Sequence, residues 1–173
     1  MKSNIVLIGM AASGKSTTGV VLAKTMGKNF VDTDLYIQQK TGKTLQEILN
    51  EDGIDAFKEI EEEILSGVDA CDAVISTGGS AVYYPESMKN LGKDGIIVYL
   101  NVPLKVIENR LSNIKTRGVI LQKGETIEDL YNYRAPMYEK YADIVIEAGD
   151  SSLEETVEMI CRAVDEYRKT EER

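Results

Sequence analysis

The sequence has no histidine and no tryptophan, and it has only two cysteines among 173 residues. Histidine is the most frequent general base and the commonest metal ligand, so its absence excludes His–Ser or His–Cys catalysis and histidine-ligated metal sites. A general base in this chain has to be a carboxylate or a lysine. Cys71 and Cys161 are far apart in the sequence and fit no metal-ligand spacing, so we expect reduced cysteines that serve packing.

Long hydrophobic runs and basic clusters are missing as well. No apolar segment approaches the ~20 residues that cross a membrane, and the apolar run after residues 1–4 is too short for a signal peptide. The net charge is −9, and no basic stripe of the kind that binds nucleic acid is present. We therefore expect a cytoplasmic protein with no membrane or nucleic-acid partner, in which a few placed cations bind an acidic substrate.

One stretch carries a specific functional motif. Residues 9–16, GMAASGKS, match the phosphate-binding loop pattern G-x-x-x-x-G-K-[ST]. The apolar run 4–8 before the loop predicts a buried strand, and residues 16–26 after it predict a helix. The alternative is a chance glycine-rich turn that opens an ordinary helix, but the exact Lys-Ser pair between this strand and this helix speaks against it.

The loop predicts a site for the phosphates of a nucleotide. Backbone N–H groups and the positive end of the helix dipole bind phosphate oxygens in such loops. Lys15 can reach the β- and γ-phosphates, and the Ser16 hydroxyl can bind Mg²⁺. The residues expected to contact the nucleotide here are Ala11, Ala12, Ser13, Gly14, Lys15, Ser16 and Thr17.

The rest of the chain alternates strand and helix patterns. Strands are predicted near 29–34, 73–76, 95–100 and 143–147, with helical segments between them. This alternation predicts one α/β domain over residues 1–173, a three-layer α/β/α arrangement with a five-stranded parallel sheet, and we expect a monomer. The helix predicted over 125–141 should be interrupted near Pro136. The polar stretch 112–124 predicts an exposed, mobile loop.

Polar residues follow the predicted strands where a parallel sheet binds its ligands. Ligands bind beyond the carboxyl ends of such strands. This rule gathers Asp32, Asp34, the pair Gly78 and Gly79, and the loop with Arg117 around the phosphate-binding loop. On an extended segment the two aspartates share a face, so one can approach Mg²⁺ and the other an acceptor hydroxyl. The alternatives are a helix N-cap for an aspartate and a plain turn for the glycines.

These motifs resemble the shikimate kinase family, small-molecule kinases with the phosphate-binding-loop fold of the nucleoside-monophosphate-kinase type. The resemblance runs from Ile5 to about Glu147. It covers residues 9–16, 32–34, 41–42, 57–58 with 61, 77–79, 98–100, 110–111, 117, 134–138 and 141–143. The Asp-x-Asp, Gly-Gly and Arg-x-Pro-x-Tyr motifs, in this order and at these spacings, are the specific part. The resemblance implies ATP- and Mg²⁺-dependent phosphorylation of a hydroxyl of shikimate, in aromatic amino-acid biosynthesis, under a lid at about 112–124.

The resemblance also implies roles on the acceptor side. Asp34 would bind the acceptor hydroxyl and help to take its proton. Gly78 and Gly79 would let the backbone approach the substrate, because no side chain intervenes. Arg134 would bind the substrate carboxylate, and Lys58 stands where the family has another substrate-binding cation.

On the donor side the resemblance implies a metal site and two arginine contacts. Asp32 would orient Mg²⁺ through water, with Ser16 as the direct ligand. Arg117 in the lid would meet the transferring phosphate together with Lys15. Arg110 would lie against the adenine. Each arginine could instead be a solvated surface residue.

Three positions depart from the family's pattern. Lys58 stands in place of an arginine, whose fork binds a carboxylate with two hydrogen bonds, whereas lysine is a point charge. Ser80 replaces the third glycine of a Gly-Gly-Gly run, and Gly118 replaces the proline after the lid arginine. Phosphoryl transfer from ATP is therefore the firmer expectation. Another small hydroxy acid or polyol is an alternative acceptor, and a non-catalytic nucleotide-binding module is an alternative of another class.

Overall fold

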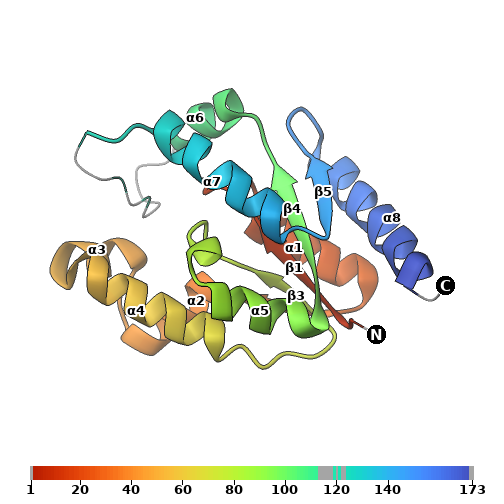
Figure 1. Cartoon of the computed structure of the whole chain (residues 1–173), viewed down its shortest axis with the longest axis horizontal. Helices are drawn as coiled ribbons and strands as arrows, with labels where there is room; N and C mark the ends of the chain where they lie inside the picture. The colour runs from red at the N-terminus through yellow and green to blue at the C-terminus, as the bar shows by residue number, and fades with distance from the viewer. Residues whose placement is uncertain (1, 113–118, 120, 122–123, 172–173) are drawn as a thin grey trace.

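A five-stranded parallel sheet with helices on both faces forms the centre of the molecule (Figure 1). The computed structural model describes residues 2–112, 119, 121 and 124–171. The strand order is β2-β3-β1-β4-β5. The strands are β1 (Asn4–Ile8), β2 (Asn29–Asp32), β3 (Ala73–Ser76), β4 (Gly95–Asn101) and β5 (Ile144–Glu147). The helices are α1 (Lys15–Met26), α2 (Thr33–Thr41), α3 (Leu45–Glu51), α4 (Gly53–Ser66), the short 3₁₀ helix η1 (Ala81–Tyr83), α5 (Pro85–Asp94), α6 (Leu104–Ser112), α7 (Ile127–Tyr141) and α8 (Leu153–Glu171).

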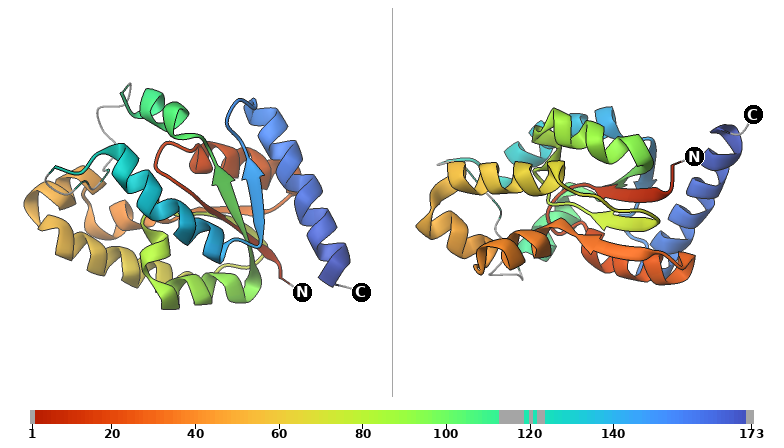
Figure 2. Two further views of the ribbon diagram at one scale, coloured as in Figure 1. Left: turned by 45° about the horizontal axis from the view of Figure 1, so that its top comes forward. Right: turned by 90° about the horizontal axis from the view of Figure 1, so that it is seen from below.

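The layers are those that the alternating pattern predicts. Helices α1 and α8 pack on one face of the sheet and α5 and α7 on the other (Figure 2). The central strand β1 is buried along its whole length, and Ile5 pairs with Val74 of β3 and Ile96 of β4. Strands covered on both faces are almost entirely apolar, as these are. The predicted α/β/α fold with five parallel strands is confirmed.

A second, smaller core lies beside the sheet. Helices α2, α3 and α4 pack on one another around Ile37, Ile48 and Phe57. A capping box between Thr44 and Glu47 opens α3. Helix α4 also contacts α5 and η1. The small core therefore holds α4 beside the sheet, where side chains of this helix line the site described below.

The prediction that Pro136 interrupts its helix is wrong. Helix α7 is continuous from Ile127 to Tyr141, with Pro136 inside it. A proline removes one backbone hydrogen bond and strains the preceding turn. Here Arg134 and Tyr138, on either side of Pro136, are both buried, so tertiary packing holds the helix together across the proline.

Two further predictions concern features outside the site, the cysteines and the absence of membrane-spanning helices. Both cysteines are free, but Cys71 is exposed, so its predicted packing role is wrong, while Cys161 is half-buried. Across residues 2–112 and 124–171, no helix has the length and apolar character to cross a membrane.

Candidate active site

The phosphate-binding loop connects β1 to α1 through strained backbone that glycine permits. Gly9 has φ 144° and Gly14 has φ 93°. A Cβ atom at Gly9 would lie 2.8 Å from the carbonyl oxygen of Leu100, so no side chain fits there. Gly14 is the N-cap of α1 and lacks a side chain that could bond the first-turn N–H groups. Those N–H groups are therefore available to an anion, as the motif predicts.

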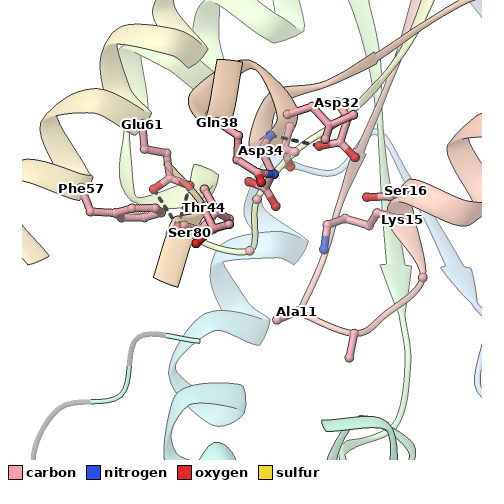
Figure 3. A pocket seen from close by; sticks show the side chains of 17 residues that line it. Ala11, Lys15, Ser16, Asp32, Asp34, Gln38, Thr44, Phe57, Glu61 and Ser80 are labelled. Carbon is pink, nitrogen blue, oxygen red and sulfur yellow. Dashed lines mark hydrogen bonds between the residues drawn. The ribbon is translucent and has the colours of Figure 1, made fainter. Parts of the chain in front are cut away.

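Lys15 is buried at the start of α1, with 7% of its surface exposed. Its Nζ donates to the carbonyl oxygens of Gly9 and Met10, each at 2.8 Å. The loop thus supplies the hydrogen bonds that a buried ammonium group needs. The side chain lines the cavity that opens from the loop toward Asp34 (Figure 3).

That first cavity has a volume of about 430 Å³ and gathers most of the predicted donor and metal residues. Its predicted residues are Ala11, Ala12, Gly14, Lys15, Ser16, Asp32, Asp34, Gly78 and Gly79. Arg110 lies beside the loop, and its Nη1 donates to the carbonyl of Ala12 at 3.0 Å. Ser13 is buried within the loop, while Thr17 is exposed in the first turn of α1. Arg117 lies outside the described residues, as do most residues of the predicted lid.

The two aspartates lie in the cavity, but not on one extended segment. Strand β2 ends at Asp32, and α2 begins at Thr33. Asp32 is the N-cap of α2, and its Oδ1 accepts a hydrogen bond from the Asp34 backbone N–H at 3.0 Å. The predicted shared face of a strand is therefore wrong, because the helix starts between the two carboxylates. Asp32 caps the helix and lines the cavity at the same time.

Gly78 and Gly79 follow β3 and lie between charged groups. A Cβ atom on Gly78 would lie 2.7 Å from Glu61 Oε1 and 3.0 Å from Asp34 Oδ1. A Cβ atom on Gly79 would lie 3.0 Å from Arg134 Nη1. The Gly79 carbonyl accepts a hydrogen bond from Tyr138 OH at 2.6 Å. The pair is thus more than a turn: its lack of side chains allows two carboxylates and a guanidinium group to close around one piece of backbone.

Arg134 is a buried cation, with 4% of its surface exposed. Its Nε donates to Tyr83 OH at 2.8 Å, and its guanidinium carbon lies 4.9 Å from the centre of the Tyr83 ring. Burial lowers the pKa of Arg134, but Tyr138 and Tyr83 outweigh burial and the pKa is raised. Among the residues that the structure describes, no carboxylate forms an ion pair with it. A buried guanidinium group of this kind suits an incoming anion.

A second cavity, of about 500 Å³, lies next to the first and brings Lys58 and Arg134 together. Lys58 comes from α4 and Arg134 from α7. The aromatic residues Tyr83, Tyr84 and Tyr133 also line this cavity. The predicted substrate-binding residues therefore divide between two adjoining cavities. Asp34 and the glycines line the first, and the two cations line the second.

Glu61 and Ser80 line both cavities, and the motifs assigned neither a role. Glu61 is 1% exposed, and burial is the main cause that raises its pKa to about 7. Hydrogen bonds from Ser80 and Tyr84 lower the pKa and Asp34 raises it. One sequence signal could have revealed Glu61: with Phe57 and Leu65 it occupies the buried face of α4, at helical spacing. An acidic residue on an apolar helix face is uncommon, so its presence indicates a structural or functional role.

Comparisons with known proteins agree on one family. The model of the shikimate kinase family matches residues 11–165. The shikimate kinase of Thermodesulfovibrio yellowstonii is 38% identical over 96% of this chain and 95% of its own length. The Psychrobacter enzyme of the same name is 31% identical over 95% of this chain and 93% of its own. The structure of the Acinetobacter baumannii shikimate kinase in complex with shikimate superposes with a TM-score of 0.85, at 29% identity, over 94% of this chain and 92% of that one.

Proposed function

The chain belongs to the shikimate kinase family, and from that premise we propose that it transfers the γ-phosphate of ATP to a hydroxyl group of shikimate in the two adjoining cavities. Family membership makes the chain a small-molecule kinase that uses ATP. We propose in addition which residues carry the reaction, which hold a metal ion, and that the chain acts as a monomer.

The observation that carries the proposal is the pair of groups on either side of Gly78–Gly79. Asp34 faces one glycine and Arg134 faces the next, each within about 3 Å of where a Cβ atom would lie. A substrate that rests on this backbone can therefore present a hydroxyl to the Asp34 carboxylate and a carboxylate to the Arg134 guanidinium group. Shikimate is a small ring compound that carries both groups.

The donor half consists of the loop and Lys15. The N–H groups of residues 11–17 would bind the phosphate oxygens of ATP, and the Lys15 ammonium group would exchange its loop carbonyls for the β- and γ-phosphates. This chemistry depends mainly on positioning and on charge, so a preplaced cation is its principal requirement. Arg110, bonded to the Ala12 carbonyl beside the loop, would lie against the adenine.

Ser16 and Asp32 would hold Mg²⁺ with the phosphates. Both side chains are hard oxygen donors that line the first cavity, and Ser16 Oγ lies 3.4 Å from Ser76 Oγ. In the described part of the chain, no group of three or more acidic or cysteine side chains could hold a metal ion without other ligands. One or two protein oxygens completed by phosphates are typical of Mg²⁺. When bound, the ion would neutralise charge on the phosphates.

The acceptor half consists of Asp34, Lys58 and Arg134. The Asp34 carboxylate would accept a hydrogen bond from the substrate hydroxyl and orient its oxygen for in-line attack. Lys58 and Arg134, which line one cavity, would bind the substrate carboxylate from two sides. We also propose that Arg117, which lies outside the described residues, meets the transferring phosphate.

We further propose that the chain acts as a one-domain monomer in the cytoplasm, where ATP is available. Both halves of the site come from a single chain, which supports the monomer. Light scattering on the purified protein should give a mass near the 19.2 kDa of one chain, and a mass of twice that value would contradict the proposal.

The experiment that tests the function is a coupled assay of ADP release with a panel of acceptors. The panel contains shikimate, gluconate, a neutral polyol and water alone. We expect shikimate to give the highest kcat/KM and the polyol, which lacks a carboxylate for Arg134 and Lys58, to give background turnover. If another hydroxy acid is turned over fast while shikimate is not, the assignment of the acceptor is wrong. ATP binding without turnover of any acceptor would favour a non-catalytic module.

A further inference from the structure

Glu61 lies on the wall between the two cavities, and two hydroxyl groups hold it there. Ser80 Oγ lies 2.7 Å from each carboxylate oxygen of Glu61 and donates to this group. Tyr84 OH donates to Oε2 at 2.8 Å. Figure 3 shows Ser80 pointing to Glu61 across the cavity wall. The carboxylate is thus fixed by neutral donors from the segment that follows Gly78–Gly79.

In the part of the chain that the structure describes, no cation pairs directly with Glu61, although the charge of Arg134 is near enough to lower its pKa. Of the residues that the structure describes, no lysine or arginine lies within ion-pair distance of its carboxylate. A buried carboxylate without an ion pair depends on its hydrogen bonds, because leaving it unsatisfied costs the full desolvation penalty. The Ser80 hydroxyl is therefore one of two groups that allow Glu61 to stay where it is.

Lys58 is the one basic residue of α4, the helix that carries Glu61. It precedes Glu61 by three positions on α4, a spacing that places side chains on adjoining parts of one helix face. Lys58 is exposed, lines the second cavity and, within residues 2–112 and 124–171, forms no ion pair. If Glu61 lost a donor, the flexible lysine side chain could move to it, and the ammonium group would leave the cavity that faces Arg134.

We propose that Ser80 is a positioning residue that holds the Glu61 carboxylate and thereby leaves the Lys58 ammonium group to the carboxylate of the acceptor. The inference rests on the proposed function, because it assumes an anionic acceptor in the second cavity. It also gives a reason for two departures from the family's pattern. An arginine has five donors and can bond Glu61 and a substrate at once, whereas a lysine is a compact point charge. Ser80 donates to Glu61 the hydrogen bond that an arginine at position 58 could donate and that Lys58 does not.

The test is a double-mutant cycle over Ser80→Ala and Lys58→Arg. Ser80→Ala removes only the hydroxyl, so we expect KM for shikimate to rise about tenfold, the loss of one charged contact, while KM for ATP stays within twofold. Lys58→Arg alone, with Ser80 in place, gives the reference effect of the arginine on KM for shikimate. In the double variant the arginine should bring KM for shikimate most of the way back to the wild-type value. Ser80→Thr, which keeps a hydroxyl, should have a KM for shikimate like that of the wild type.

A second measurement does not depend on the substrate. The ¹³C signal of the Glu61 side-chain carboxyl reports its titration by NMR, and the Ser80 hydrogen bond lowers the pKa of this group. We expect Ser80→Ala to raise that pKa in a Lys58→Met background, where no ammonium group can move to the carboxylate, and Ser80→Thr in the same background to leave it unchanged. With Lys58 present the rise should be smaller, because the ammonium group that moves to Glu61 favours the charged form.

These outcomes separate the inference from the function on which it rests. If wild-type protein fails to phosphorylate shikimate while Ser80→Ala still moves the Glu61 titration, the positioning contact stands and the acceptor is wrong. If the titration does not move in the Lys58→Met background, or if KM for shikimate in Ser80→Ala stays within twofold of wild type, the inference is overturned. Equal effects of Lys58→Arg in both backgrounds would also overturn it. Should Ser80→Ala fail to fold, Ser80→Gly takes its place in the cycle with the same expected results.

Discussion

The proposed donor half and the proposed acceptor half would each bind an anion, but with different parts of the chain. The core of the donor half is one continuous segment, residues 9–17, in which backbone N–H groups and Lys15 would bind the phosphates. The acceptor half collects side chains from α2, α4, the segment before η1, and α7. Its cation Arg134 is buried among tyrosines, and its carboxylate Glu61 is held by hydroxyl groups.

The two halves differ in how strongly single substitutions should affect them. A backbone cradle depends little on side-chain identity, apart from glycines such as Gly9 that admit no Cβ atom. A pocket built from side chains depends on each of them, and single substitutions retune it. Lys58 and Ser80, two of the three departures from the family's pattern, both line the second cavity, in the proposed acceptor half.

The largest effect should come from the group at the boundary of the halves. Asp34→Asn removes the charge that orients the acceptor hydroxyl, so we expect kcat to fall about 10³-fold while ATP binding, measured by calorimetry, is unchanged. Asp55→Asn, at an exposed aspartate on α4, is the matched control and should behave as wild type. Near-normal turnover by Asp34→Asn would remove this residue from the reaction.

A smaller loss is expected on the donor side. Lys15→Met removes the buried ammonium group, and we expect kcat to fall about 10²-fold because charge on the transferring phosphate is no longer offset. KM for shikimate should stay within threefold of wild type, which initial rates with both substrates varied would show. Lys24→Met, an exposed position on the same helix, serves as control. A large rise in KM for shikimate would mean that the halves are not separable.

On the acceptor side we expect an effect on KM for shikimate instead of on kcat. Arg134→Lys keeps the charge but loses the planar fork, so KM for shikimate should rise about 30-fold while KM for ATP is unaffected. The exposed Arg162→Lys controls for the chemical change. Since Arg134 is buried, thermal unfolding of both variants should accompany the kinetics. An unchanged KM for shikimate in folded Arg134→Lys would contradict the assigned contact.

The smallest predicted effect concerns stability and pH. The pKa of Glu61, about 7, lies above the ordinary value of 4.5, so the folded state holds this proton more tightly than the unfolded state. The stability that this group contributes is fully present below about pH 4.5 and is lost as the pH rises to about 7. Glu61→Gln removes that dependence.

Melting temperatures test this prediction. Between pH 5 and pH 8, the wild type should lose a few degrees more than Glu61→Gln, and Glu62→Gln, at the exposed neighbouring position, should follow the wild type. Parallel pH curves for wild type and Glu61→Gln would show that the carboxyl is not perturbed.

The sequence predicted the fold well, because the strands and helices follow from local patterns. Strands β1 and β3 have the predicted bounds, and the loop is a contiguous motif whose geometry is set by its own glycines. Prediction was less accurate where tertiary contacts decide. Asp32 proved to be a helix cap. Helix α7 is continuous across Pro136 because the residues on either side of the proline are packed in the interior.

The acceptor half was only partly predictable. The resemblance indicated Arg134 and Gly78–Gly79, but the contacts that give these residues their setting come from segments far apart in the chain. Tyr83 lies 51 positions from Arg134, and Ser80 lies 19 positions from Glu61. No periodic pattern joins such residues, so their partnership became visible only in the folded chain.

The most direct test of the account is a crystal structure of this protein with shikimate and a non-hydrolysable ATP analogue. We expect the shikimate carboxylate within about 3 Å of both the Arg134 guanidinium group and the Lys58 ammonium group. We also expect one ring hydroxyl at the same distance from the Asp34 carboxylate, with the phosphates on residues 9–16. Shikimate bound with its carboxylate away from Arg134, or with no hydroxyl facing Asp34, would contradict the division into these two halves.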